Sequence, residues 1–144
     1  RDAVGVPLVV NGDIESLKDA RRACAASGAD AVMVGRGSYG QPWLAGQIAQ
    51  AAGYQAGSVV SAPSPEDLAG YVVAHYEDML SHYGSNTGVR HARKHLGWYL
   101  DRHTVPGPET DRLRKRIMTS KQPEEVIRLI SHALAEAPIA AEAA

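Results

Sequence analysis

The sequence lacks most of the features that mark secreted, membrane-bound or metal-binding proteins. Cys24 is its only cysteine, so no internal disulfide can form, and a reducing cytoplasm is the expected location. No apolar run is long enough to cross a bilayer, and the six histidines follow no zinc-ligand spacing. We therefore expect neither a membrane nor a metal partner. The first residues contain no initiator Met and no export signal, which indicates a sequence that begins part-way through a longer chain.

Composition is that of a folded protein with an uneven charge distribution. The 144 residues are 44% hydrophobic and 22% charged, which is typical of one domain or a piece of a larger one. The net charge is −1, yet residues 85–121 hold nine Lys/Arg and only three Asp/Glu, a local charge of +6. Such a segment is typical of a surface for a polyanion or of a solvated helix face, and charge alone favours the second.

The first 53 residues repeat the order strand, loop, helix. Continuous apolar runs predict buried strands at residues 6–10 and 31–34, each followed by a loop that contains glycine. Between them, apolar residues at helical spacing predict a helix that Asp13 caps and Gly28 ends, and a second helix begins at Pro42.

Strands that are apolar throughout are typical of a parallel sheet covered on both faces, and two such strands are too few for a stable sheet. The fold class predicted for residues 1–53 is therefore α/β, namely the last two βα units of a (β/α)8 TIM barrel that needs further strands.

The rest of the chain is predicted to be all-α. Residues 54–64 form an expected linker, and Ser64 with Pro65 is a helix start signal. Four helices joined by short loops predict a small four-helix bundle over residues 65–137, followed by a frayed tail at 138–144. The residues expected to be buried in the last three helices are Val89, Ala92, Leu96, Tyr99 and Leu100, then Leu113 and Ile117, then Val126, Ile127, Ile130 and Leu134.

The two strand-end loops are a candidate phosphate site. Such loops expose backbone N–H groups, and the helix that follows adds the positive end of its dipole. Glycines let an anion approach the backbone, and Arg36 brings a permanent positive charge. The candidate residues are Asn11, Gly12, Asp13, Gly35, Arg36 and Gly37. Ordinary βα turns, in which glycine serves only the geometry, fit the spacing equally well.

The helix expected over residues 87–103 places cations beside aromatic rings. Arg90 and Lys94 lie one turn apart with Arg93 at their border, next to a stripe of rings that includes His95. Cations that meet phosphates and rings that stack are suited to RNA. The cations that could extend this surface are Arg112, Arg114, Lys115 and Arg116. A partly buried Trp98 beside uninvolved histidines is the alternative interpretation, which we favour for Trp98 itself.

Four segments resemble the tRNA-dihydrouridine synthase family, in its bacterial B-type or nitrogen-regulation-like branch. Residues 6–14 resemble the family's seventh barrel strand and residues 28–37 its eighth. Residues 40–44, Gly-Gln-Pro-Trp-Leu, resemble the segment that follows. Residues 93–99, Arg-Lys-His-Leu-Gly-Trp-Tyr, resemble the basic motif of the family's C-terminal helical domain, which other flavin barrels lack. The resemblance identifies the chain as a C-terminal fragment of such an enzyme.

This resemblance implies a flavoprotein that uses FMN, reduced by NADPH, to saturate the C5–C6 bond of uridines in tRNA. Asn11, Gly12 and Asp13 would form one wall of the FMN phosphate site, and Gly35, Arg36 and Gly37 the other. Asp13 is expected to cap its own helix, because a carboxylate repels phosphate. The contacts to tRNA would come from Arg90, Arg93, Lys94 and His95.

No catalytic residue is expected in this chain. The family's proton donor is a cysteine in an upstream barrel loop, whereas Cys24 lies within a helix and is expected to be a packing residue. The fragment is therefore expected to be inactive alone. Two other functions stay open: another FMN-dependent barrel that acts on a small metabolite, and a non-catalytic RNA-binding module. No obligate protein partner is evident.

Overall fold

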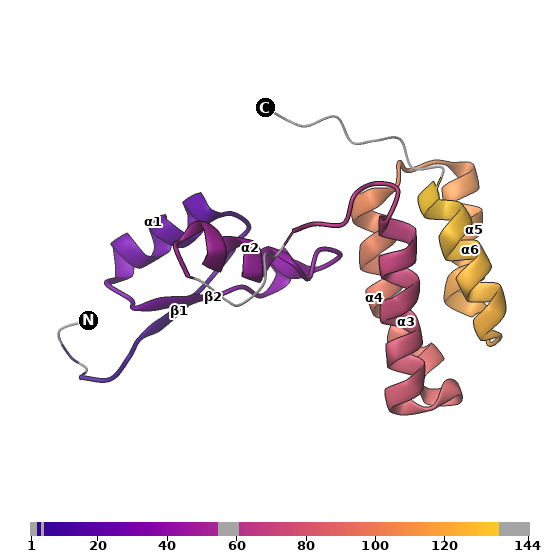
Figure 1. Cartoon of the computed structure of the whole chain (residues 1–144), viewed down its shortest axis with the longest axis horizontal. Coiled ribbons are helices and arrows are strands. Elements are labelled where there is room, and N and C mark those ends of the chain that lie inside the picture. Colours follow the sequence, from indigo (N-terminus) through magenta and orange to yellow (C-terminus); the bar gives the residue numbers. More distant parts are fainter. Residues whose placement is uncertain (1–2, 4, 55–60, 136–144) are drawn as a thin grey trace. The chain divides into compact units, whose positions relative to one another are not determined.

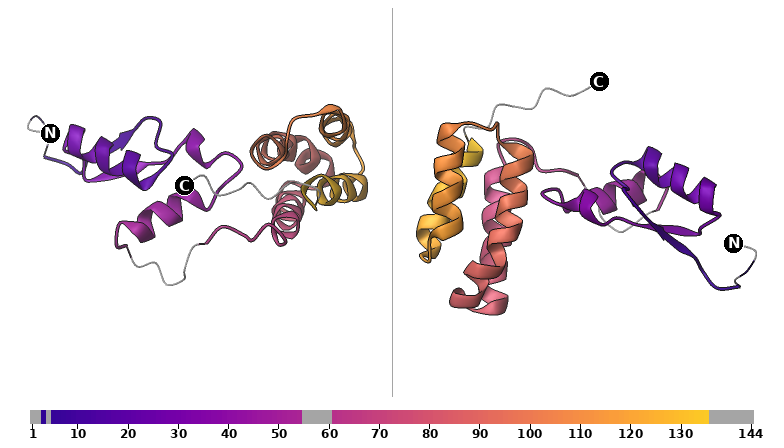
Figure 2. Two further views of the ribbon diagram at one scale, coloured as in Figure 1. Left: turned by 90° about the horizontal axis from the view of Figure 1, so that it is seen from above. Right: turned by 180° about the vertical axis from the view of Figure 1, so that it is seen from behind.

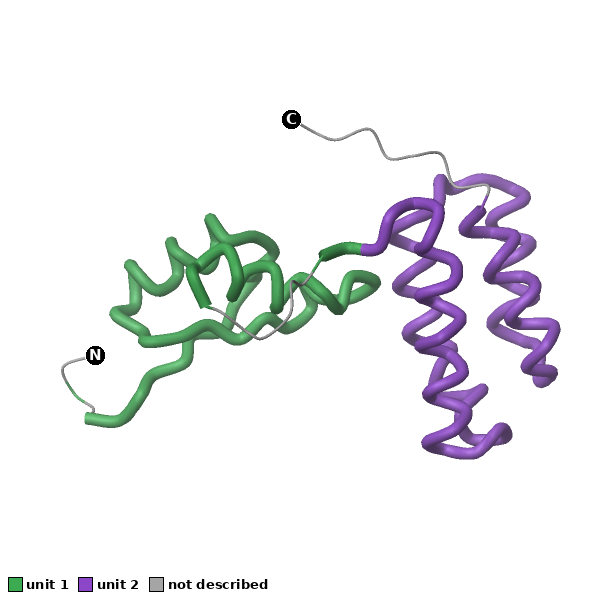
Figure 3. The backbone as a smooth tube through the Cα atoms, viewed as in Figure 1, with its two compact units in different colours: residues 1–62 green, residues 63–144 purple. Residues whose placement is uncertain are grey.

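A computed structural model describes residue 3, residues 5–54 and residues 61–135. The chain divides into two compact units, Arg1–Ala62 and Pro63–Ala144, which we call the sheet unit and the helical unit (Figure 3). The domain limits expected from the sequence stay predictions. Part of the expected linker, at 55–60, and the expected frayed tail at 138–144 lie outside the described residues.

The sheet unit is built on two short parallel strands. β1 (Val9–Asn11) pairs with β2 (Ala31–Met33), with Val10 opposite Val32 (Figure 1). Parallel pairing is confirmed, but β1 begins and ends later than the predicted strand at 6–10. Just before the paired strands, the Leu8 N–H donates to the Asp30 side chain, at Oδ2, over 2.8 Å. The residues before Leu8 have no partner in β2, because the chain is still leaving α1 at Gly28. Asn11, predicted to lie in the turn, is therefore the last strand residue.

Only one face of this sheet is covered by described residues. Val32 and Val34 pack against a core of Ile14, Ala20, Leu44 and Ile48. On the other face Val9 is 55% exposed and Met33 is 48% exposed. The cover expected on both faces is thus absent from the described part of this chain. Exposed apolar side chains on a sheet indicate a surface that another element covers.

α1 (Leu17–Ser27) confirms one predicted cap and corrects the other. Gly28 has the left-handed backbone expected at a C-terminus, with φ 64°, and its N–H donates to the Cys24 carbonyl. The N-cap, however, is Ser16, whose Oγ accepts from the Asp19 N–H at 3.1 Å. The predicted cap at Asp13 is therefore wrong: three residues, including the buried Ile14, separate Asp13 from the first helical residue, Leu17.

Two more elements belong to the described part of the sheet unit. The single 3-10 turn η1 (Arg36–Ser38) follows β2, and α2 (Leu44–Ala51) starts two residues after Pro42. The core side of α2 is formed by Leu44 and Ile48, which are both buried. Figure 1 shows α1 running alongside the paired strands, as their contacts require.

The described residues of the helical unit form four packed helices. α3 (Leu68–Tyr83) begins later than the start signal at Ser64 and Pro65 predicts, and its N-cap is Asp67. Ser64 Oγ accepts from the Asp67 N–H at 3.2 Å in the turn that leads into the helix. α4 (Ser85–His103) contacts α3, α5 and α6, and all five residues predicted for its apolar stripe are buried. At Gly88 an added Cβ would lie 2.9 Å from the Leu80 Cα, so glycine permits the close approach of α3 and α4.

α5 (Pro108–Thr119) and α6 (Pro123–Ala135) run beside these two helices (Figure 2). Leu113 and Ile117 are buried as predicted. In α6 the prediction holds for three of four residues: Ile127 is only half-buried, and Leu129 is buried in its place. α6 contacts α3, α4 and α5, so its buried face is wider than a single stripe and turns toward Leu129. No helix in the described ranges is long and apolar enough to span a membrane.

Candidate functional site

The two strand-end loops line one polar pocket of about 510 Å³. All six residues predicted for the phosphate site contribute to it, so the structure brings them together. A Cβ built on Gly35 would lie 3.8 Å from Asn11 Oδ1, which shows how closely the two loops approach. The full lining is Asn11, Gly12, Asp13, Ile14, Glu15, Gly35, Arg36, Gly37 and Tyr39.

The backbone of these loops requires particular residue types. Gly12 has φ 146° and Asp13 has φ 43°, conformations that side chains with a Cβ rarely adopt, although aspartate tolerates the second. Gly37 is buried, and a Cβ there would collide with the Ile14 carbonyl oxygen. Glycine at position 37 is therefore needed for packing between the loops, whereas Gly12 leaves open space beside the pocket.

Charges of both signs face this pocket. Arg36 Nη2 and Asp13 Oδ1 form an ion pair at 3.1 Å across the two loops, with side chains 79% and 85% exposed. An exposed pair of this kind contributes at most about 1 kcal/mol. The Arg36 guanidinium can therefore exchange Asp13 for a better anionic partner at little cost. Glu15 adds a second carboxylate to the lining.

Backbone donors complete the electrostatics of the pocket. η1 begins within its wall, and the N–H groups of Arg36 and Gly37 donate to no acceptor among the described residues. Unpaired N–H groups at the start of a helical turn attract anions. With the Arg36 side chain, they form a set of donors suited to phosphate oxygens.

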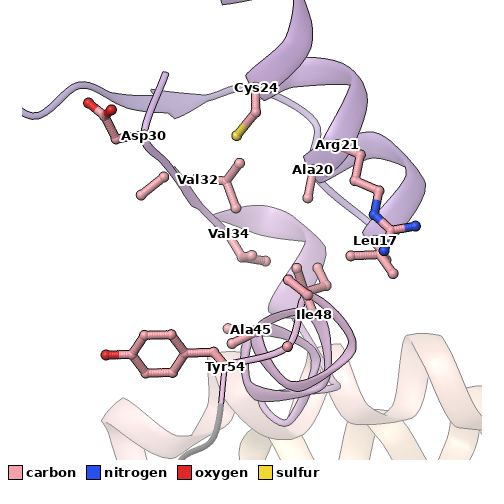
Figure 4. A pocket seen from close by; sticks show the side chains of 14 residues that line it. Leu17, Ala20, Arg21, Cys24, Asp30, Val32, Val34, Ala45, Ile48 and Tyr54 are labelled. Carbon is pink, nitrogen blue, oxygen red and sulfur yellow. The ribbon is translucent and has the colours of Figure 1, made fainter. Parts of the chain in front are cut away.

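A second pocket, of about 490 Å³, was not anticipated from the sequence (Figure 4). It lies among α1, β2 and α2 and is mainly apolar, with Leu17, Val32 and Ile48 in its wall. Cys24 lies in α1 as predicted, half-buried, and its side chain points into this pocket. The small residues Ala20, Ala45 and Ala49, which leave this space, were its only signal in the sequence.

In the helical unit, the four residues predicted to bind RNA do not share one environment. Arg90 and Lys94 are exposed on α4. Arg93 is partly buried: its Nη2 donates to the Ser120 carbonyl at 3.3 Å, and its Nε is buried with no acceptor among described residues. The structure thus directs Arg93 toward the end of α5, away from a free surface.

His95 is half-buried between two other rings. Its ring centroid lies 5.5 Å from that of His75 and 5.0 Å from that of Trp98. Burial lowers the pKa of His95, and the nearby His75 and Lys94 lower it further. His95 is therefore predominantly neutral at pH 7 and does not add to the positive charge. Trp98 is partly buried as predicted, and Lys94 Nζ lies 4.9 Å from its ring centroid.

Three of the four cations on α5 are already paired with carboxylates. Arg112 contacts Glu109 at 2.8 Å, and Arg116 contacts Glu125 at 2.7 Å. Arg114 donates to both oxygens of Asp101, at 2.6 and 3.3 Å. The local charge of +6 is therefore partly neutralised on this helix, while Arg90 and Lys94 have no ion-pair partner in the described ranges.

Sequence reasoning missed the rings that α3 brings to this surface. His75 Nδ1 lies 3.0 Å from the hydroxyl of Tyr99, and Tyr83 stacks on His91. Burial raises the pKa of Tyr99, so its hydroxyl keeps its proton. These contacts depend on how α3 packs against α4, and a helical wheel of one helix does not show that packing. No group of His, Cys, Asp and Glu suited to a metal occurs in the described ranges.

Comparison with known proteins identifies the class. A sequence profile of the dihydrouridine synthase (Dus) family matches residues 1–139. A probable tRNA-dihydrouridine synthase of Rhizobium leguminosarum bv. phaseoli is 46% identical over 134 residues, covering 93% of this chain and 39% of that protein. The probable tRNA-dihydrouridine synthase of Rhodobacter capsulatus is 44% identical over 136 residues, covering 94% of this chain and 40% of that protein.

A tRNA-dihydrouridine synthase B of Xanthomonas axonopodis pv. citri is 36% identical over 127 residues, covering 88% of this chain and 36% of that protein. All three relatives are named as tRNA-dihydrouridine synthases. The chain belongs to the dihydrouridine synthase family, as its four motifs predict. It spans about two fifths of the length of the curated relatives it matches.

Proposed function

We propose that the sheet unit holds the phosphate of FMN and that the helical unit binds tRNA, within an enzyme that reduces uridine to dihydrouridine. One observation carries the proposal: the loops after β1 and β2 meet in a single pocket whose wall holds Arg36 and N–H groups with no acceptor among the described residues. β1 and β2 would be the last two strands of a (β/α)8 barrel, and the bare face with Val9 and Met33 would meet the remaining strands.

The residues of this pocket fit a phosphate group. Gly12 leaves space beside the backbone, and the N–H groups of Arg36 and Gly37 have no other acceptor among the described residues. The Arg36 guanidinium would leave Asp13 and pair with the phosphate, because a dianion forms stronger charge-assisted hydrogen bonds than a single exposed carboxylate. The Asp13 carboxylate would then face water and salt ions, which screen part of its repulsion of the phosphate.

Bound FMN, reduced by NADPH, would supply the hydride that saturates the C5–C6 bond of uridine. This chain would bind the cofactor's phosphate and the RNA, and the proton donor is expected from elsewhere in the enzyme. Cys24 lies in α1 and lines the apolar pocket, whereas Arg36 lines the polar pocket, and the two linings share no residue. Activity of this chain alone is therefore not expected. The cytoplasmic location inferred from the lone cysteine stays a prediction.

Flavin titration of the 144-residue chain tests the phosphate assignment. FMN should bind more tightly than riboflavin, which lacks the phosphate. Arg36→Ala should weaken FMN binding about tenfold, since a charge-assisted hydrogen bond contributes roughly 1.5 kcal/mol, and leave riboflavin binding unchanged. Arg22→Ala is the matched control, because Arg22 also forms an exposed ion pair but lies on α1 away from the pocket.

Equal affinities for FMN and riboflavin would overturn the assignment. So would an Arg36→Ala variant that binds FMN as tightly as the unchanged chain.

A further inference from the structure

Aromatic rings of α3 and α4, some exposed and some partly buried, lie along the hairpin that these two helices form. At the hairpin end, Tyr83 stacks on His91 with centroids 4.9 Å apart and ring planes 11° from parallel. His82 meets the Tyr83 ring edge-on at 4.5 Å. Farther along α4, Trp98 lies beside His95. The rings therefore form two separate groups, one around Tyr83 and one around Trp98. His91, His95 and Trp98 follow helical spacing (i, i+4, i+7) and so share one face of α4.

The stacked pair is not part of the core. Tyr83 is 47% exposed and His91 is also exposed, whereas the core tyrosines Tyr76 and Tyr99 are 2% exposed. The tight contact of α3 and α4 is made elsewhere, at Gly88 and the buried stripe of α4. Packing of the helices thus does not require the Tyr83–His91 stack, which leaves a flat ring surface open to a ligand.

Two cations of α4 lie close to these rings in the chain. Arg90 adjoins His91 in the chain, and Lys94 holds its ammonium over the Trp98 ring. Neither cation has an ion-pair partner in the described part of the chain, in contrast to Arg114 and Arg116 on α5. A ligand of this surface therefore combines a flat π system with negative charge, and that combination is the chemistry of an unpaired nucleotide.

We propose that Tyr83 and His91, with Arg90 and Lys94 beside them, form a stacking platform for unpaired bases of the RNA. The ligand class rests on the proposed function, which makes RNA the partner of the helical unit. Bases within a duplex already stack on each other, so such a platform selects a loop, bulge or single-stranded end. The cations bind the adjoining phosphates without regard to sequence.

Binding of two RNA probes to the 144-residue chain, measured by fluorescence anisotropy, tests the platform. One probe is a hairpin with an unpaired loop, and the other is a fully paired duplex of equal charge. Tyr83→Leu should weaken binding of the hairpin about tenfold and hardly change binding of the duplex, because stacking of a base is lost but no phosphate contact. Tyr83→Phe keeps the ring and should bind the hairpin as tightly as the unchanged chain.

Tyr54→Leu is the matched control, because Tyr54 is 73% exposed but lies in the sheet unit. Circular dichroism verifies that the variants keep their helices. Unchanged hairpin binding in Tyr83→Leu, or an equal loss for hairpin and duplex, would overturn the platform. Charge removal at Arg90 and Lys94 separates the two proposals. If it weakens tRNA binding while Tyr83→Leu does not, only the platform fails; if it changes nothing, RNA binding by this surface fails as well.

Discussion

The two units differ in how much of a core each one contains. Among the described residues, fifteen apolar side chains are buried in the helical unit and four in the sheet unit. The sheet unit also leaves Val9 and Met33 exposed on an uncovered face. Since burial of apolar surface is the main source of stability, the helical unit can be stable by itself, whereas the sheet unit depends on further cover.

Their charges differ in a similar way. In the sheet unit, Arg36 meets Asp13 across the pocket, so its cation has to change partners before it binds an anion. In the helical unit, α5 keeps its arginines in ion pairs, while Arg90 and Lys94 on α4 have no such partner in the described ranges. The comparison teaches that a local charge of +6 does not show which cations are available to an anion until their ion pairs are known.

The largest expected effect tests the core of the helical unit. Leu100 is 1% exposed, so Leu100→Ala leaves a cavity and should lower the free energy of unfolding by roughly 2–5 kcal/mol. Urea unfolding followed by Trp98 fluorescence, in a Trp43→Phe background, measures this change. Val105→Ala is the control at 58% exposure and should cost less than about 0.5 kcal/mol. Equal costs would contradict a core contained within this unit.

A smaller effect is expected where α3 and α4 approach each other. Gly88→Ala places a Cβ 2.9 Å from the Leu80 Cα and should destabilise the helical unit by about 1–3 kcal/mol. Gly70 is the matched control on α3, because a Cβ there meets nothing within 4 Å. Gly70→Ala should stabilise the unit by up to about 1 kcal/mol through helix propensity. Thermal unfolding of both variants measures the difference, and changes of the same sign would contradict the close approach.

Salt dependence sharpens the comparison between free and paired cations. Replacing Arg90 and Lys94 by Gln should reduce the slope of log affinity for tRNA against log salt by about 1.4–1.8, which is two phosphate contacts. The same double change at Arg114 and Arg116 removes equal charge from residues that already contact Asp101 and Glu125. This second variant should change the slope less. Equal reductions would show that pairing in the free protein does not decide RNA contact.

The smallest effect concerns pH. Burial lowers the pKa of His95 below its ordinary value, so the unfolded chain binds this proton more tightly than the folded chain. The contribution of neutral His95 to the free energy of unfolding is therefore complete above about pH 6.5, and it declines as the pH falls below that value. His95→Gln should reduce the decline in melting temperature on acidification. The same decline in His95→Gln as in the unchanged chain would contradict this assignment.

Local signals in the sequence predicted the helix ends and the helical core well. Gly28 forms the predicted cap, and Ser64 accepts from Asp67 in the turn that leads into α3, because such local bonds depend on a few neighbouring residues. The stripe of α4 was predicted because helical spacing alone sets which residues share a face. The convergence of the two loops also followed from pattern, since the carboxyl ends of parallel strands meet at one edge of a sheet.

Contacts between elements were beyond the sequence. Asp13 could not be told from Ser16 as a cap without knowing that Asp13 meets Arg36 across the loops. Leu129 is buried because α6 touches three helices, which a single stripe does not reveal. Arg93 donates to the Ser120 carbonyl and Tyr83 stacks on His91 because packing brings together residues that are distant in the sequence. The roles of these residues in binding stay predictions.

Amide chemical shifts of the 144-residue chain, recorded with FMN and with riboflavin, test the central claim most directly. If the loops after β1 and β2 bind the cofactor's phosphate, the amides of Gly12, Arg36 and Gly37 shift with FMN and stay in place with riboflavin. Shifts confined to the apolar pocket around Cys24, or equal shifts with both flavins, would contradict the account.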